Sequence, residues 1–182
     1  MKTLIISLMV WGLLFMVGSP TTTLSAQPIH KIEVGSHIPQ FKLPDQNGNI
    51  FDIHKVLGKK NLVIYFYPKD GSPGCTKEAC SFRDNIDYFR KSDATVIGIS
   101  GDDVKSHQKF GKNNHLNFTL LSDQGNKVRK LFGVPASMMG AIPGRVTYVV
   151  NRKGIVIHIY NSLTKPENHI QEALSALKYE KK

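Results

Sequence analysis

The chain has 182 residues and a formal net charge of +10, with 24 lysine and arginine residues against 14 acidic ones. The lysines are scattered, and no basic helix or run of basic and aromatic residues indicates a nucleic-acid-binding surface. Two cysteines, Cys75 and Cys80, are too few for the disulfide framework of a small stapled domain, so the pair calls for a chemical explanation.

The first 26 residues have the order of a secretory signal peptide. Lys2 supplies a positive start, an uncharged apolar run extends from Leu4 to Val17, and small and polar residues follow as far as Ala26. The apolar run is shorter than the roughly 20 residues that a membrane-spanning helix needs. We therefore expect residues 1–26 to be cleaved and residues 27–182 to form one domain, with an uncleaved anchor as the alternative.

The remaining sequence alternates between strand and helix patterns. Residues 41–53 predict a β-hairpin with Asn47-Gly48 at the turn. After the hairpin, β-branched apolar runs indicate buried strands, and apolar residues three and four apart indicate amphipathic helices. The expected strands are residues 61–67, 94–100, 118–121, 146–150 and 154–160, and the expected helices are residues 75–91, 102–112, 125–132 and 166–177. This order predicts an α/β domain of thioredoxin-like fold, with a central mixed sheet flanked by helices and an N-terminal β-hairpin.

Cys75 lies where a strand leads through a Gly- and Pro-rich loop, residues 68–74, into a helix. Its expected place is the first helical turn, where unpaired backbone N–H groups and the helix dipole stabilise an anion. Such a position favours the thiolate, which is the reactive form of a cysteine. A thiolate of this kind attacks the O–O bond of a peroxide and becomes a sulfenic acid.

Cys80 follows Cys75 by five residues. In a regular helix, Cα atoms at that spacing lie roughly 8 to 9 Å apart, whereas a disulfide needs about 4.4 to 6.8 Å. If both cysteines are helical when reduced, a bond between them requires the first turns to unwind. We therefore interpret the pair as a redox switch and not as a permanent structural disulfide.

The stretch Pro68-Lys-Asp-Gly-Ser72-Pro-Gly-Cys75 is similar to the peroxiredoxin signature, in which a proline, a threonine or serine and the peroxidatic cysteine keep fixed spacing. The cysteine five residues later, followed by Ser81-Phe-Arg-Asp84, resembles the branch of the bacterioferritin-comigratory proteins and peroxiredoxin Q. Similar segments over most of the remaining chain are residues 96–102, 118–123, 133–136 and 139–148. Ser72 is a departure, because threonine is more usual at that position.

The resemblance implies a thiol-specific peroxidase acting on hydrogen peroxide and organic hydroperoxides. It implies that Cys75 attacks, that Cys80 resolves through an intramolecular disulfide, and that Arg145 supplies a permanent positive charge to the thiolate and the peroxide. Ser72 is expected to hydrogen-bond the thiolate, and Pro68 to shield the pocket.

The resemblance also bears on cofactors and partners. No bound cofactor or metal is implied, the reductant is expected to be a thioredoxin-like dithiol protein, and the protein is expected to be a monomer. Glu78 has two interpretations at this point: it orients Arg145, or it is an exposed residue of the helix. The periplasm is the expected compartment, with the thylakoid lumen or the cell exterior as alternatives.

Two other functions are weighed against the peroxidase. An exported thiol–disulfide oxidoreductase of thioredoxin type uses two cysteines separated by two residues, whereas four residues intervene here. A copper-delivering metallochaperone needs a distal histidine ligand, for which His158 is the candidate. The seven histidines show no close metal-ligand cluster in the sequence.

Overall fold

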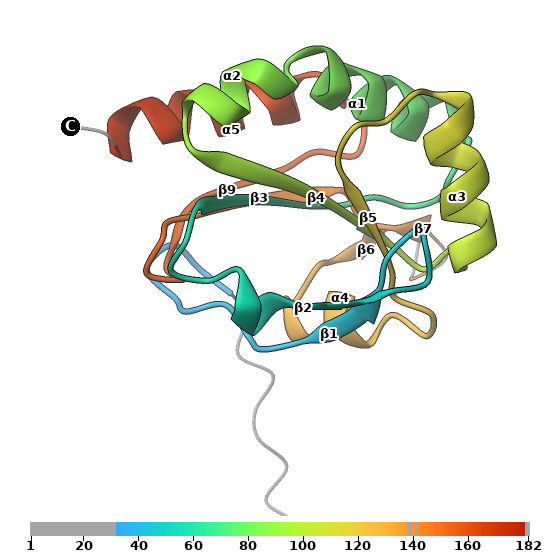
Figure 1. Ribbon diagram of the computed structural model, residues 1–182, viewed down its shortest axis with the longest axis horizontal. Coiled ribbons are helices and arrows are strands. Elements are labelled where there is room, and N and C mark those ends of the chain that lie inside the picture. The colour runs from blue at the N-terminus through green and yellow to red at the C-terminus, as the bar shows by residue number, and fades with distance from the viewer. Residues whose placement is uncertain (1–31, 138–139, 141, 181–182) are drawn as a thin grey trace, which may run out of the picture.

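A mixed five-stranded sheet forms the centre of the computed structural model, which describes residues 32–137, 140 and 142–180. The expected signal peptide, residues 1–26, lies outside the described residues. The strands are β3 (Asn61–Phe66), β4 (Ala94–Ser100), β5 (Thr119–Ser122), β8 (Val146–Val150) and β9 (Val156–Asn161). Their order is β5-β4-β3-β8-β9; β3, β4 and β5 run parallel, and β8 is antiparallel to both of its neighbours. The expected mixed sheet with a hairpin at its end is confirmed (Figure 1).

The central strand β3 is buried on both faces, which explains why its sequence is a continuous apolar run. Successive side chains of a strand point to opposite faces. Leu62, Ile64 and Phe66 accordingly belong to the apolar core on one face of the sheet, and Val63 and Tyr65 to the core on the other. The end of this strand leads through the loop of residues 67–72 to the helix that contains both cysteines.

Four helices cover one face of the sheet. They are α1 (Pro73–Asp84), α2 (Ile86–Lys91), α3 (Val104–Asn113) and α5 (Asn168–Glu180), and α1, α2 and α5 lie side by side over it (Figure 1). The rings of Tyr65 on β3 and Phe82 on α1 stack with their centroids 4.6 Å apart. Tyr65 in turn lies over Gly98 of β4, where an added Cβ would come within 2.7 Å of the ring. These contacts fix α1 against the sheet.

The expected single helix over residues 75–91 is wrong, because the chain breaks into α1 and α2 at Asn85. The Asn85 side-chain amide donates to the Ser81 carbonyl at 2.9 Å, and its backbone N–H also bonds to that carbonyl. An asparagine side chain competes in this way with the regular backbone ladder. Both cysteines therefore lie in the first of the two helices, α1.

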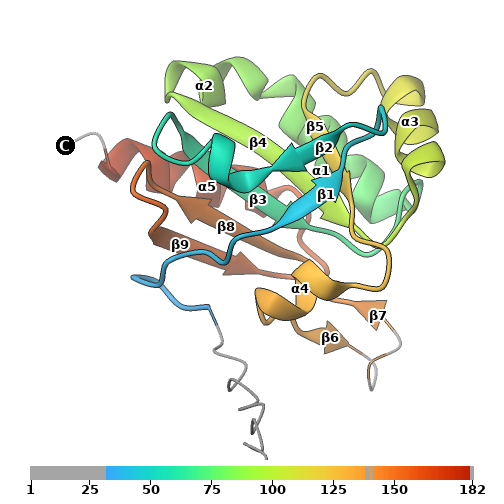
Figure 2. The same ribbon diagram turned by 60° about the horizontal axis from the view of Figure 1, so that its bottom comes forward.

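The other face of the sheet carries the N-terminal hairpin and a short helix. Strands β1 (Lys42–Pro44) and β2 (Ile50–Asp52) pair antiparallel, as expected, and lie with the 3-10 helix η1 (Ile53–Lys55) and α4 (Lys127–Leu131) on this face (Figure 2). In the hairpin turn, Asp45 Oδ1 accepts from the backbone N–H groups of Asn47 and Asn49 at 2.8 and 2.9 Å. Gly48 supplies the positive φ, 84°, that this turn requires.

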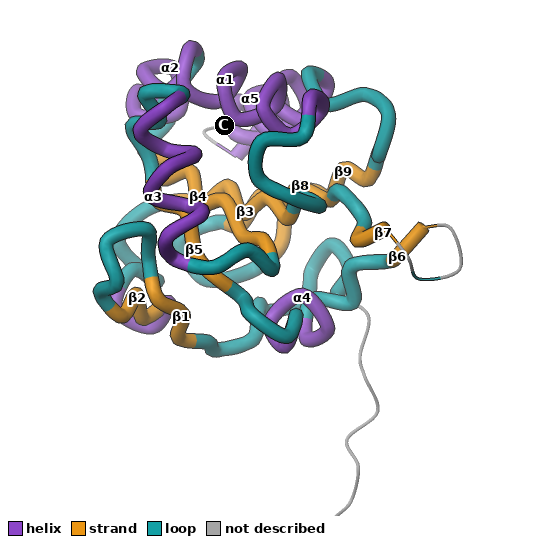
Figure 3. Tube along the Cα trace, turned by 90° about the vertical axis from the view of Figure 1, so that its right-hand side faces the viewer, coloured by secondary structure: helices purple, strands orange, loops and turns teal. Residues whose placement is uncertain are grey.

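A second small pair of strands was not predicted from the sequence. β6 (Ala136–Ser137) and β7 (Ile142–Pro143) pair antiparallel and stand apart from the central sheet (Figure 3). The Gly144 N–H then donates to the Pro135 carbonyl at 2.8 Å, and a Cβ on Gly144 would collide with that carbonyl. This close approach sets the path of the chain into Arg145 and β8.

Candidate active site

Cys75 occupies the first turn of α1, as the sequence predicts. Ser72 is the N-cap in extended conformation, and Pro73 takes the first helical position, where its missing N–H costs nothing. The exposed fraction of Cys75 is only 1%, so the thiol lies within the core between α1 and the sheet. Burial at a helix N-terminus shields the sulfur from bulk water while leaving it close to backbone N–H groups.

Arg145 lies immediately before β8 and points at the sulfur. Its Nη2 group donates to Cys75 Sγ at 3.4 Å, and its Nε group donates to the Leu163 carbonyl at 3.3 Å. Gly74 makes room for the guanidinium, because a Cβ at that position would lie 3.2 Å from Nη2. With an exposed fraction of 3%, Arg145 is a buried cation directed at a buried thiol.

Glu78 lies one helical turn after Cys75 and is fully buried. Its Oε2 atom accepts from Arg145 Nη1, so contact with Arg145, and not exposure on the helix, is the alternative that the structure supports. Burial raises the pKa of Glu78 to about 8, although the charge of Arg145 and its hydrogen bond act in the opposite direction. The carboxyl holds one terminal nitrogen of the guanidinium while the other contacts the thiol.

His169, in the first turns of α5, is a site residue that the sequence analysis did not identify. It is fully buried, with Nδ1 2.8 Å from Thr147 Oγ1 and Nε2 2.9 Å from the Ser162 carbonyl. Its Nδ1 atom also lies 3.6 Å from Glu78 Oε1. Burial lowers the pKa of His169 to about 4; the hydrogen bond to Ser162 opposes this effect and the charge of Arg145 adds to it.

Cys80 faces a different part of the molecule from Cys75. It is half-buried, and its thiol contacts Asn114 Oδ1, at the C-terminal end of α3, at 3.9 Å. Arg83 reinforces this contact, because its Nη1 group donates to the Asn114 carbonyl at 2.7 Å. Both cysteines are free thiols within one regular helix, so a disulfide between them requires α1 to open.

Ser72 and Pro68 lie in the loop between β3 and α1. The Ser72 hydroxyl donates to the Lys69 carbonyl at 3.0 Å. Pro68 is half-buried and follows the last residue in register with the sheet, Tyr67, whose N–H donates to the Ile99 carbonyl at 3.1 Å. The structure therefore brings Cys75 and Arg145 into direct contact and leaves Ser72 bonded elsewhere.

Asp70 anchors this loop, which the sequence analysis did not foresee. Its carboxylate accepts from Tyr67 OH at 2.7 Å and from Ser106 Oγ at 2.8 Å, and it lies 2.8 Å from His107 Nδ1. Its backbone N–H donates to Asp102 Oδ2 at 2.9 Å. The loop before Cys75 is thus tied to the turn between β4 and α3, and the start of α1 is held in place.

A second buried guanidinium, that of Arg129, links two segments of the chain next to the site. Arg129 of α4 donates through Nη1 to the Gly144 carbonyl at 2.8 Å and through Nη2 to the Tyr67 carbonyl at 2.6 Å. These bonds join the chain before Arg145 to the chain before the cysteine loop. Burial lowers the pKa of Arg129, while the nearby groups of Asp123 and Cys75 act in the opposite direction.

No metal centre or membrane-spanning helix emerges from the part of the chain that the structure describes. Within it, no group of three or more His, Cys, Asp and Glu side chains could hold a metal ion. His158 is the candidate copper ligand, but its Nε2 atom lies 3.0 Å from Glu172 Oε2. Among the same residues no helix has the length and apolar character needed to cross a bilayer.

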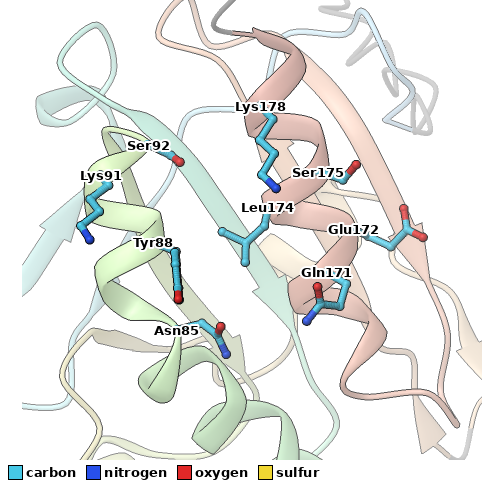
Figure 4. A pocket seen from close by; sticks show the side chains of 9 residues that line it. All are labelled: Asn85, Tyr88, Lys91, Ser92, Gln171, Glu172, Leu174, Ser175 and Lys178. Atoms are coloured by element: carbon cyan, nitrogen blue, oxygen red, sulfur yellow. The ribbon is translucent and has the colours of Figure 1, made fainter.

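One hollow of the described surface lies away from the thiols. It is a groove of about 780 Å³ between α2 and α5, in which Tyr88 and Leu174 face each other and Lys91 and Lys178 lie toward one end (Figure 4). Neither cysteine lines it. This groove is therefore separate from the buried cluster of Cys75, Arg145 and Glu78.

Comparisons with known proteins identify the family of the chain. Residues 34–159 match the AhpC/TSA family. The chain is 53% identical over 147 residues to "Peroxiredoxin Q, chloroplastic" of Oryza sativa subsp. japonica, covering 81% of this chain and 67% of that protein.

Solved structures give the same result. The fold matches peroxidoxin BcpB of Mycobacterium tuberculosis with a TM-score of 0.76 and 33% identity, covering 81% of this chain and 97% of that one. It matches peroxiredoxin Q of Xanthomonas campestris with a TM-score of 0.71 and 33% identity, covering 78% and 92% of the two chains. The chain therefore belongs to the AhpC/TSA family, within which it groups with the peroxiredoxin Q thiol peroxidases.

Proposed function

We propose that this protein reduces peroxides with Cys75 as the attacking thiol and Cys80 as the thiol that resolves the oxidised intermediate. The observation that carries the proposal is the 3.4 Å contact between Arg145 Nη2 and Cys75 Sγ, two groups that are almost fully buried. A guanidinium remains charged at any physiological pH. In a water-poor site solvent screens this charge little, so it acts on the negative charge that the attacking sulfur and the peroxide carry.

In the first step the Cys75 thiolate attacks one oxygen of the peroxide. The O–O bond breaks, that oxygen remains on sulfur as a sulfenic acid, and the other oxygen takes a proton and leaves as water or an alcohol. The sulfur loses two electrons and the peroxide gains them. Arg145, the Cys75 backbone N–H and, after rotation, the Ser72 hydroxyl are the donors available to the developing negative charge. Pro68 shields the pocket.

In the second step Cys80 attacks the Cys75 sulfenic acid. A sulfur–sulfur bond forms and water leaves, provided that α1 unwinds enough to bring the two sulfurs together. A thioredoxin-like dithiol protein then returns both cysteines to thiols, giving up two electrons and two protons and becoming a disulfide itself. Hydrogen peroxide and organic hydroperoxides both fit this scheme, which needs no bound cofactor.

For location and assembly we propose an exported monomer. Residues 1–26 have the pattern of a signal peptide, which leaves residues 27–182 as the working domain, with the periplasm as destination and the thylakoid lumen or exterior as alternatives. N-terminal sequencing of the protein isolated from fractionated cells tests the cleavage, and sedimentation of the purified protein tests the monomer. Cleavage elsewhere or a stable dimer would contradict these two points.

Intact-mass spectrometry after one equivalent of hydrogen peroxide tests the assignment of the thiols. The wild type is expected to lose two hydrogens, because both thiols end in one disulfide. Cys80→Ser is expected to gain one oxygen on Cys75, and Cys75→Ser is expected to keep its original mass. Rapid and equal oxidation of the two single variants would mean that they are ordinary thiols, and would contradict the proposal.

A further inference from the structure

Cys75, Glu78, Arg145 and His169 form a buried cluster in which negative groups outnumber the available positive charge. Their exposed fractions are 1%, 0%, 3% and 0%, so none of them is screened by bulk water. Arg145 contacts both Cys75 and Glu78. A thiolate on Cys75 and a carboxylate on Glu78 would therefore compete for the single charge of Arg145.

The hydrogen bonds of His169 define where its protons lie. A carbonyl oxygen only accepts, so the contact of Nε2 with the Ser162 carbonyl at 2.9 Å places a proton on Nε2. In the neutral ring Nδ1 then carries only a lone pair. That lone pair accepts the hydrogen bond of the Thr147 hydroxyl at 2.8 Å, and Glu78 Oε1 lies beyond hydrogen-bond distance from Nδ1, at 3.6 Å.

Glu78 Oε1 has no hydrogen-bond partner among the described residues, although it is fully buried. An ionised oxygen there would be an unpaired buried charge beside an electron-rich ring nitrogen, which is costly on both counts. A proton on Oε1 removes that charge. The orphaned oxygen and the neutral histidine beside it thus fit a protonated Glu78.

We propose that Glu78 holds a proton on Oε1, beside the neutral ring of His169, while Cys75 is a thiolate, so that the charge of Arg145 is left for the thiolate and the incoming peroxide. The effect on the incoming peroxide rests on the proposed function, whereas the location of the proton does not. With this proton the cluster is neutral overall, and without it the cluster carries one uncompensated negative charge. His169 touches neither sulfur nor substrate, so it is a positioning residue that acts through Glu78.

Besides Cys75, the groups that face Glu78 come from three other parts of the chain. Arg145 precedes β8, His169 lies on α5, and Tyr65 lies on β3, while Cys75 shares α1. Burial is the main cause that raises the pKa of Tyr65 well above its usual value, so Tyr65 stays neutral. Burial also raises the pKa of Glu78 to about 8 and lowers that of His169 to about 4, which assigns the proton mainly to Glu78.

The first test is infrared spectroscopy of the reduced full-length protein. At neutral pH the wild type is expected to show the carbonyl stretch of a protonated carboxylic acid that is absent from Glu78→Gln and fades as the pH is raised. Glu172→Gln, which changes a half-exposed glutamate of α5, is the matched control and is expected to keep the band. Absence of the band at neutral pH would overturn the proposal.

The second test is the pH dependence of Cys75 oxidation by hydrogen peroxide, measured by stopped flow in a Cys80→Ser background. The rate is expected to rise as the thiolate forms and to fall at alkaline pH as the proton leaves Glu78. Glu78→Gln imitates the protonated acid, so it is expected to remove the alkaline fall and to slow the neutral-pH rate by less than about tenfold. A Glu78→Gln protein that keeps the fall, or is inert at every pH, would overturn the proposal.

His169 supplies a double-mutant control. His169→Phe removes the electron-rich Nδ1 atom that disfavours a negative charge on Oε1, so the alkaline fall is expected to shift about one pH unit lower. His169→Asn, which retains an acceptor oxygen near the Nδ1 position, is expected to restore most of this shift. Neither change is expected to alter the profile in Glu78→Gln; an equal loss of rate at every pH in both backgrounds would indicate a merely structural role and contradict the proposal. If Cys75 is inert to peroxide in every variant, the proposed function fails, and the infrared band still locates the proton.

Discussion

Arg145 is the residue on which the account depends most. Its Nη2 group meets Cys75 Sγ, while its Nη1 and Nε groups are directed to Glu78 and to the Leu163 carbonyl. This fork-shaped arrangement uses the planar geometry of a guanidinium, which a lysine ammonium on a flexible stem does not reproduce. The charge and its direction are therefore both properties of the arginine.

Replacing Arg145 by lysine is expected to keep a positive charge and lose the aimed donors. The rate of Cys75 oxidation by hydrogen peroxide should fall on the order of a hundredfold, the usual cost of removing a preorganised donor from a developing anion. Stopped-flow oxidation of the Cys80→Ser protein with and without Arg145→Lys measures this change. Arg152→Lys is the control, because Arg152 lies exposed in the turn between β8 and β9, where it pairs with Asp93. Equal effects at the two positions would contradict the role of Arg145.

At this scale, the sequence was informative where residues form a local motif. Cys75, Cys80, Ser72 and Pro68 lie within one short stretch, and Arg145 was identified only by family resemblance. Glu78 had two interpretations, because burial on the side facing Arg145 depends on how α1 packs on the sheet. His169 was missed, since its contacts with Thr147 and Glu78 join segments far apart in the chain.

The helix α1 is the element that must change shape during the proposed cycle. Its N-terminal end is held by the loop that Asp70 anchors, and its C-terminal end stops at Asn85. Cys80 is held through Asn114, whose carbonyl also binds Arg83 and whose side-chain amide donates to the Phe110 carbonyl at 2.9 Å. These contacts stabilise the closed, reduced helix and oppose its opening.

Asn114→Ala is expected to speed disulfide formation after Cys75 has become a sulfenic acid. The change removes a weak hydrogen bond from Cys80, and a loss of about 1 kcal/mol from the closed helix would make opening roughly fivefold more frequent. Rapid quenching with a thiol-blocking reagent followed by mass spectrometry measures the rate. Asn113→Ala, at an exposed neighbouring position, is the control. An unchanged or slower rate would show that Asn114 does not restrain the helix.

The hydrophobic pattern of the sequence predicted the type and order of the helices and strands well. It predicted their boundaries, and the break between α1 and α2, less well. The buried strands β3 and β4 begin where expected, since both are continuous apolar runs. The break at Asn85 was missed, because it depends on a side-chain bond to Ser81 and not on the apolar pattern. The β6–β7 pair was missed because strands of two residues carry no periodic signal.

The free energy of unfolding of the whole protein is expected to depend on pH through two buried groups, Glu78 and His169. The pKa of His169 is lowered from 6.5 to about 4, so the folded state loses stability as the pH falls through that interval. The pKa of Glu78 is raised from 4.5 to about 8, so the folded state loses stability as the pH rises through that interval. Between pH 6.5 and 8 only the Glu78 contribution still changes.

Glu78→Gln is therefore expected to flatten the pH dependence of stability above pH 6.5. Across this interval the free energy of unfolding of the wild type should fall by up to about 2 kcal/mol relative to the variant. Denaturant titrations of both reduced proteins over the same pH series measure the difference. Parallel stability curves for the two proteins would mean that Glu78 does not bind a proton in this interval.

The most direct test of the central claim is the second-order rate constant of hydrogen peroxide with the reduced Cys80→Ser protein, in which Cys75 is the one remaining cysteine. The account predicts a rate on the order of a thousandfold or more above that of free cysteine at the same pH, because the site favours the thiolate and holds donors for the leaving oxygen. A rate equal to that of free cysteine would contradict the assignment of Cys75 as the peroxide-attacking residue.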